Sequence, residues 1–139
     1  MQYLLRFLRR GPISPRVHGT LDYLLAAALV VVPLAVDFHD ETATVLMLVL
    51  GGAATLLAIG TNWSTGIIRV LPPVLHGAAD IAATIVLIIA PFVLGFTDHT
   101  VATVLYVVIG AGGLGATLLT RFESDLMPAA RIASQQPAV

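Results

Sequence analysis

The chain contains no cysteine among its 139 residues, which excludes a disulfide, a thiolate metal site and a cysteine nucleophile. Charge is also scarce, because 11% of the residues are charged, whereas soluble domains typically have about a quarter. Lysine is absent, so all seven basic residues are arginines. With 58% hydrophobic residues and a mean hydropathy of +0.94, the composition is that of an integral membrane protein.

Four apolar segments are long enough to cross a bilayer, which takes about 20 residues of helix. We expect these spans at residues 17–38, 42–61, 74–96 and 100–119. The connectors at 39–41 and 97–99 are acidic and free of arginine, whereas the arginines lie at positions 6, 9, 10, 16, 69, 121 and 131. The positive-inside rule therefore predicts a multi-pass protein of the bacterial inner membrane with both termini in the cytoplasm.

The domain organisation follows from these spans. We expect an interfacial amphipathic segment at 1–13, a first repeat at 14–61, a cytoplasmic linker at 62–72, a second repeat at 73–120 and a disordered cytoplasmic tail at 121–139. A signal peptide is the competing interpretation of the first span. It is disfavoured because Pro33 would occupy the small-residue position two before a cleavage after Ala35.

The two halves share the pattern Pro-x-x-His-Gly-x-x-Asp, which begins at Pro15 and again at Pro73. The alignment continues along both halves, and after one extra residue in the second copy it matches Thr61 with Thr120. Two spans in each copy make the copies parallel, related by a pseudo-twofold axis along the membrane normal. The sequence therefore predicts an all-α membrane protein with four transmembrane helices, arranged as two tandem parallel hairpins.

Several other residues carry structural expectations. Pro33 and Pro91 lie about one turn from the outer ends of their helices, where each is expected to cause a kink. Trp63 is interpreted as an anchor at the membrane interface and Tyr106 as a packing residue. Small residues four apart predict close helix packing; these pairs are Ala54 with Ala58, Ala111 with Gly115, and Gly112 with Ala116.

Beyond the histidine pattern, four stretches stand out at residues 16–19, 21–23, 66–72 and 90–96. In these stretches the chain resembles the SPW-repeat family of small bacterial membrane proteins, over roughly residues 16–120. The resemblance implies a two-repeat, four-helix membrane protein and brings no established reaction or ligand. The chain departs from the family at the name-giving Ser-Pro-Trp triplet, because it has Val32-Pro33-Leu34 and Ala90-Pro91-Phe92 there.

The repeated histidine and aspartate are four residues apart, so His18 with Asp22 and His76 with Asp80 each share one helix face. If the repeats meet around their axis, all four side chains converge near the cytoplasmic surface. Ionisable groups in a membrane are costly and are usually paired or functional. One interpretation is a structural cluster that ties the repeats together, with Arg16 and Arg69 as further partners of the carboxylates.

The functional alternatives use the same four residues. Imidazole and carboxylate ligands at His18, Asp22, His76 and Asp80 could bind a divalent metal ion, or they could relay protons. Haem held by the two histidines ranks lower, because bulky neighbours such as Leu21 leave little room for it. A second, weaker polar site lies in the outer connectors; its pairs are His39 with Asp40 and Asp98 with His99.

We therefore expect a non-enzymatic membrane protein of structural, assembling or accessory role, without a cofactor. Metal, proton or haem binding remain alternatives. The lipid bilayer is the expected partner, and the small-residue pairs are compatible with a homo-oligomer or a larger membrane complex. Nothing in the chain is typical of nucleic-acid binding. Within residues 24–32 and 81–90, Thr84 has the only side chain that can form a hydrogen bond, so no transport path across the membrane is expected.

Overall fold

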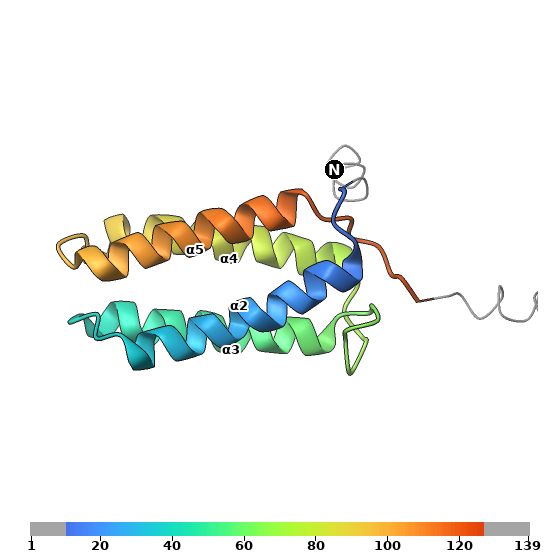
Figure 1. Cartoon of the computed structure of the whole chain (residues 1–139), viewed down its shortest axis with the longest axis horizontal. Coiled ribbons are helices and arrows are strands. Elements are labelled where there is room, and N and C mark those ends of the chain that lie inside the picture. The colour runs from blue at the N-terminus through green and yellow to red at the C-terminus, as the bar shows by residue number, and fades with distance from the viewer. Residues whose placement is uncertain (1–10, 127–139) are drawn as a thin grey trace, which may run out of the picture.

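A computed structural model describes residues 11–126, which form four long helices joined by short connectors (Figure 1). The helices are α2 (Pro15–Ala35), α3 (Glu41–Gly60), α4 (Pro73–Leu94) and α5 (Thr100–Leu118). Each is long and apolar enough to cross a membrane, so the four expected spans are confirmed, although the first ends at Ala35 rather than at residue 38. The expected interfacial segment and tail lie largely outside the described residues.

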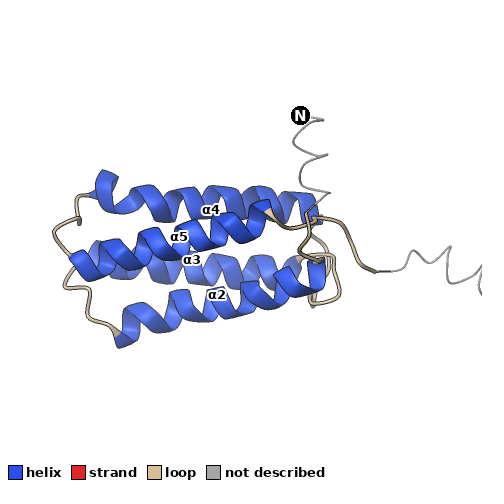
Figure 2. Ribbon diagram, turned by 45° about the horizontal axis from the view of Figure 1, so that its top comes forward, coloured by secondary structure: helices blue, strands red, loops and turns tan. Residues whose placement is uncertain are grey.

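The four helices are paired as two hairpins. Helix α2 packs along α3 and α4 along α5, while the two pairs touch each other more sparsely. Both short connectors lie at one end of the bundle and the linker between α3 and α4 lies at the other (Figures 1 and 2). We call these the hairpin end and the linker end. Because both hairpins turn at the same end, the predicted tandem parallel arrangement is confirmed.

Helices α2, α3 and α4 begin where the sequence provides a capping side chain or a proline. Ser14 Oγ accepts a hydrogen bond from the Val17 amide at 3.3 Å, and the Asp40 carboxylate accepts one from the Ala43 amide at 2.7 Å. These side chains satisfy amides that have no partner within the helix. Prolines at the first helical position of α2 and α4 lack such an amide altogether. The histidine of the repeated motif thus lies three residues after the proline that starts each of these two helices.

Close packing within each hairpin depends on one glycine per hairpin that lies outside the expected small-residue pairs. A Cβ atom on Gly51 would lie 2.8 Å from Val30, and one on Gly110 would lie 2.8 Å from Ile88. These equivalent glycines therefore allow the two helices of each hairpin to approach. Ala58 is buried as expected, whereas a Cβ on Gly112 or Gly115 meets no atom within 4 Å, so these two glycines of the fourth span form no close seam within the chain. Their role in a homo-oligomer stays a prediction.

The core at the hairpin end is aromatic. The ring of Tyr106 lies 5.1 Å from that of Phe96 and 6.5 Å from that of Phe38, and all three side chains are buried. The Tyr106 hydroxyl donates a hydrogen bond to the Ala43 carbonyl at 2.6 Å, which links α5 to α3 across the repeats. Its predicted packing role is confirmed. Pro33 and Pro91 lie buried inside α2 and α4, and the kinks expected there stay predictions.

Candidate ion site between the repeats

The two histidines and two aspartates of the repeated motif lie together at the interface between the hairpins. Nε2 of His18 lies 3.3 Å from Oδ1 of Asp22 and 3.1 Å from Oδ2 of Asp80. Nε2 of His76 lies 3.0 Å from Oδ2 of both aspartates. Each imidazole therefore contacts one carboxylate of its own helix and one of the opposite repeat. We call these four residues the His/Asp cluster.

The cluster is shielded from solvent, and the nearby arginines take no part in it. The side chain of His76 is 1% exposed and that of Asp80, the most open member, 17%. Arg16 is exposed on α2, and Arg69 donates from Nε to the Gly66 carbonyl at 2.9 Å. Within residues 11–126 neither arginine forms an ion pair with a cluster carboxylate. The expected arginine partners are therefore wrong.

A threonine holds the far nitrogen of each imidazole. Thr61 Oγ1 lies 2.6 Å from Nδ1 of His76 and also 2.6 Å from the Leu57 carbonyl. A hydroxyl has one hydrogen and a carbonyl can only accept, so the hydroxyl donates to Leu57 and accepts from Nδ1–H of the ring. Thr120 stands in the same relation to His18 at 2.8 Å and donates to its own helix. Both rings therefore carry a hydrogen on Nδ1.

This tautomer has a direct electrostatic consequence. A neutral imidazole that is protonated on Nδ1 has only a lone pair on Nε2. Here that lone pair would face carboxylate oxygens at 3.0 to 3.3 Å, and lone pairs at this distance repel each other. The cluster is stable only if positive charge enters it, either as protons on the Nε2 atoms or as a cation among the four side chains.

Two aromatic side chains close the cluster on the side of the linker end. The ring of Trp63 lies 4.7 Å from that of His76 and 5.7 Å from that of His18, and Phe122 lies 5.0 Å from His18. Both aromatic residues are fully buried. The prediction that Trp63 anchors the chain at the membrane interface is therefore wrong, since its indole covers the histidines instead.

The glycine beside each histidine makes room for this aromatic cover. A Cβ atom on Gly77 would lie 2.9 Å from three atoms of the Phe122 ring. One on Gly19 would lie 2.0 Å from Thr65 Oγ1 and 3.3 Å from the Trp63 indole nitrogen. In each His-Gly pair the histidine is a member of the cluster, and the glycine leaves space for the aromatic cover.

The segment that follows each hairpin is held in place by single backbone bridges. Ile13, just before α2, pairs with Thr120, and Leu71, just before α4, pairs with Thr61. The two repeats therefore share a second sequence pattern, Thr-x-aromatic, which begins at Thr61 and again at Thr120. The alignment of the repeats matched these threonines without assigning them a role, and the pattern that would have identified the aromatic cover was missed.

The polar pairs expected in the outer connectors are arranged differently. His39 pairs with Asp37 at 2.9 Å rather than with Asp40, and both side chains are about three-quarters exposed. Asp40 instead lies 3.9 Å from His99 of the other hairpin. Asp98 is exposed and forms no ion pair within the described part of the chain. These residues do not form a second enclosed site.

The model of a known family, the SPW repeat domain, matches residues 16–120. This range spans both hairpins and ends at Thr120, the residue that bonds to His18. The chain belongs to the SPW repeat family. Comparison with curated proteins and with solved structures gave no match.

The family's name-giving triplet lies far from the His/Asp cluster. In this SPW repeat protein the tryptophan positions are occupied by Leu34 and Phe92, which are 69% and 64% exposed on the outer surface near the hairpin end. Large apolar side chains at that depth contact lipid. The two prolines of the triplets are buried against the neighbouring helices. The triplet therefore lies near the far ends of α2 and α4 and does not contribute to the cluster.

Proposed function

We propose that this SPW repeat protein binds one divalent cation between its two repeats, with His18, Asp22, His76 and Asp80 as ligands. One observation carries the proposal. The threonines hold the hydrogens of both imidazoles on Nδ1, so that both Nε2 lone pairs converge on two carboxylates. A hydrogen bond that fixes the far nitrogen of a histidine is the usual outer arrangement around a metal ligand.

The spacing and charge of the cluster support this proposal. Ligand atoms about 2.0 to 2.1 Å from a tetrahedral ion are roughly 3.3 Å apart. The nitrogen–oxygen contacts here are 3.0 to 3.3 Å, and one ligand atom from each of the four residues lies within 4.8 Å of the others. Two carboxylates and two neutral imidazoles carry a charge that a divalent ion would neutralise. Mixed nitrogen and oxygen ligands suit Zn²⁺, Mn²⁺, Fe²⁺ or Ni²⁺.

The orientation of two atoms is a further argument. Nε2 of His76 and Oδ2 of Asp22 are buried, yet neither has a hydrogen-bond partner within residues 11–126. They are 3.0 Å apart, so the angle between them, and not the distance, is unsuited to a hydrogen bond. Buried polar atoms without a partner are costly, and a shared ion would satisfy both.

A structural cluster with protonated histidines is the second candidate. It is favoured by the contact between His18 Nε2 and Asp80 Oδ2, which has hydrogen-bond geometry at 3.1 Å. Haem is disfavoured, because the carboxylates fill the space between the imidazoles and leave no slot for a porphyrin. In either candidate the protein acts as a non-enzymatic accessory of the bacterial inner membrane with cytoplasmic termini, alone or in a homo-oligomer.

Thermal unfolding of chelator-treated protein in lipid nanodiscs tests the proposal. Adding Zn²⁺, Mn²⁺, Ni²⁺ or Fe²⁺ at about 100 times the dissociation constant should stabilise the wild type by roughly 2.7 kcal/mol. Asp22→Asn and Asp80→Asn should lose this gain. The matched control is the double change Asp37→Asn with His39→Asn, which removes an exposed pair of the same chemistry.

The two candidates give different results in this experiment. If the cluster is held by protons alone, no metal raises the unfolding temperature of the wild type, while Asp22→Asn still lowers it. That outcome would replace metal binding by the structural role.

A further inference from the structure

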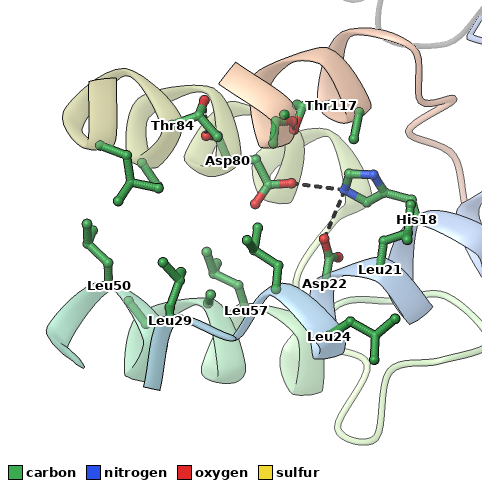
Figure 3. A pocket seen from close by; sticks show the side chains of 18 residues that line it. His18, Leu21, Asp22, Leu24, Leu29, Leu50, Leu57, Asp80, Thr84 and Thr117 are labelled. Carbon is green, nitrogen blue, oxygen red and sulfur yellow. Dashed lines mark hydrogen bonds and ion pairs between the residues drawn. The ribbon is translucent and has the colours of Figure 1, made fainter. Parts of the chain in front are cut away.

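We infer that the cavity beside the His/Asp cluster binds a lipophilic amine that enters from the bilayer, with its ammonium group on Asp80 and its apolar body between the repeats. The cavity has a volume of about 470 Å³, which is the size of a small-molecule site. It extends from the cluster toward the middle of the helices, and all four helices contribute to its wall (Figure 3).

The cavity exists because the two repeats are not identical. Its wall on the first repeat carries Leu25 and Leu57, whereas the equivalent positions of the second repeat carry Ala83 and Ala116. A further glycine, Gly113, lies on the same side of the second repeat. Large side chains at the alanine positions would fill the space, so the smaller wall of the second repeat opens it.

The polar groups of this wall that can still form a hydrogen bond are all acceptors. The hydroxyls of Thr84 and Thr117 already donate to carbonyls of their own helices. His18 uses Nδ1–H for Thr120, and its Nε2 faces carboxylates. The Asp80 carboxylate contacts both histidines through Oδ2, and its other oxygen has no partner among the described residues.

This lining selects the head group of the ligand. Figure 3 shows Asp80 with one oxygen directed at His18 and the other turned toward the cavity. An acidic, acceptor-only end favours a ligand that brings hydrogen-bond donors and positive charge. A carboxylate or phosphate head would bring only acceptors and would find no free donor in this wall to receive it. The aliphatic remainder of the wall favours an apolar body.

The route of entry is set by which surfaces are open. Leu21 and Leu24 line the cavity and are 41% and 63% exposed on the outer face of α2. The opposite side of the cluster is covered by Trp63 and Phe122, which are fully buried. The cavity therefore opens sideways toward lipid and is closed toward the linker end, which suits a ligand that partitions into the bilayer.

Amine binding does not depend on the proposed metal site. Asp80 engages the histidines through a single oxygen, and a metal-bound carboxylate still accepts a hydrogen bond on its other oxygen. The two proposals therefore fail separately.

Equilibrium binding of radiolabelled n-decylamine to the protein in lipid nanodiscs, with empty nanodiscs subtracted, tests the inference. We expect one saturable site per chain. Unlabelled n-decylamine should compete, n-decanol should compete at least about tenfold less well because it lacks the charge, and n-decanoate should not compete. Non-saturable uptake, or equal competition by decanol or decanoate, would overturn the assignment.

Variants locate the site. Ala116→Leu restores the residue of the first repeat and should weaken n-decylamine binding at least about tenfold by filling the cavity. Asp80→Asn should do the same by removing the charge. Gly115→Leu is the matched control, because it is the neighbouring residue, has open space around a Cβ and does not line the cavity, so its affinity should stay within about twofold.

Measurements of thermal unfolding and of metal content distinguish loss of the amine site from loss of the fold or of the His/Asp cluster. Each variant is checked by thermal unfolding, and Ala116→Leu should retain the wild-type metal content because it leaves all four cluster residues and the Ala116 carbonyl that accepts from Thr120 in place. A folded Ala116→Leu variant that binds n-decylamine like the wild type would overturn the inference. Loss of amine binding with retained metal would support it. Wild-type protein that binds the amine but takes up no added metal would contradict only the metal proposal.

Discussion

The Thr61 hydroxyl, at the end of the first hairpin, accepts a hydrogen bond from the imidazole of His76 in the second hairpin at 2.6 Å. Thr120 makes the reciprocal bond to His18 at 2.8 Å. Each repeat thus completes the polar site of the other. The two hairpins touch sparsely along their lengths, so these buried bonds and the His/Asp cluster are the main specific connection between them.

Removing the Thr61 hydroxyl should loosen this connection. We predict that Thr61→Val lowers the free energy of unfolding by about 1 to 3 kcal/mol, because the buried Nδ1–H of His76 loses its acceptor. It should also weaken metal binding by roughly 10- to 100-fold. Thr55→Val is the control, since the Thr55 hydroxyl bonds only to its own helix at 2.8 Å. Equal effects of the two substitutions on stability would contradict the role of Thr61.

Adding a methyl group at Gly77 should displace the aromatic cover. A Cβ there would lie 2.9 Å from the Phe122 ring, so we predict that Gly77→Ala destabilises the protein by about 1 to 3 kcal/mol. Gly52→Ala, where a Cβ meets no atom within 4 Å, should be neutral or stabilising. Combining Gly77→Ala with Phe122→Leu should cost less than the sum of the single changes in unfolding experiments. Strict additivity would show that the two residues do not interact.

The tyrosine at the hairpin end provides an independent link between the repeats. Tyr106→Phe should lower the free energy of unfolding by about 0.5 to 1.5 kcal/mol, because the Ala43 carbonyl loses its bond from the hydroxyl. Tyr23→Phe is the comparison, since Tyr23 is only partly buried and its bond to the Thr65 carbonyl is longer, at 3.1 Å. A loss for Tyr23→Phe that equals or exceeds that of Tyr106→Phe would contradict this ranking.

The absence of native cysteine makes the orientation directly testable. Thr97 in the second short connector and Ser124 after α5 are both exposed. By the positive-inside rule, Thr97→Cys should react with a membrane-impermeant maleimide in intact bacterial cells. Ser124→Cys should react only after the cells are opened. The opposite pattern of labelling would reverse the predicted topology.

The helices and their order were predictable because they follow from local properties of the chain. Apolar runs of spanning length, caps such as Ser14 and the repeated motif beginning at Pro15 and Pro73 require no knowledge of long-range contacts. The same periodicity predicted that the histidines and aspartates share a helix face. The repeat symmetry further predicted that the four side chains converge where the repeats meet, which is what the structure shows. The sequence could not predict which atoms pair, because it does not specify how two helices are rotated against each other.

The outer partners of the cluster were harder to predict. Trp63 is a polar-edged aromatic residue near a helix end, a position typical of an interface anchor, and only the fold of the linker turns it inward. The arginines were expected near the carboxylates because of their position in the chain, yet Arg69 has a φ of 59° and bonds to its own loop. Loop conformation decides both cases, and it depends on contacts far apart in sequence.

The most direct test of a shared site between the repeats is elemental analysis of the purified protein after exposure to divalent metals and removal of unbound ions. We predict about one ion per chain for the wild type and for the Asp37→Asn, His39→Asn control, and less than about a tenth of that for Asp22→Asn combined with Asp80→Asn. The same low metal content in the wild type and in this double variant would contradict a cation site built by the two repeats.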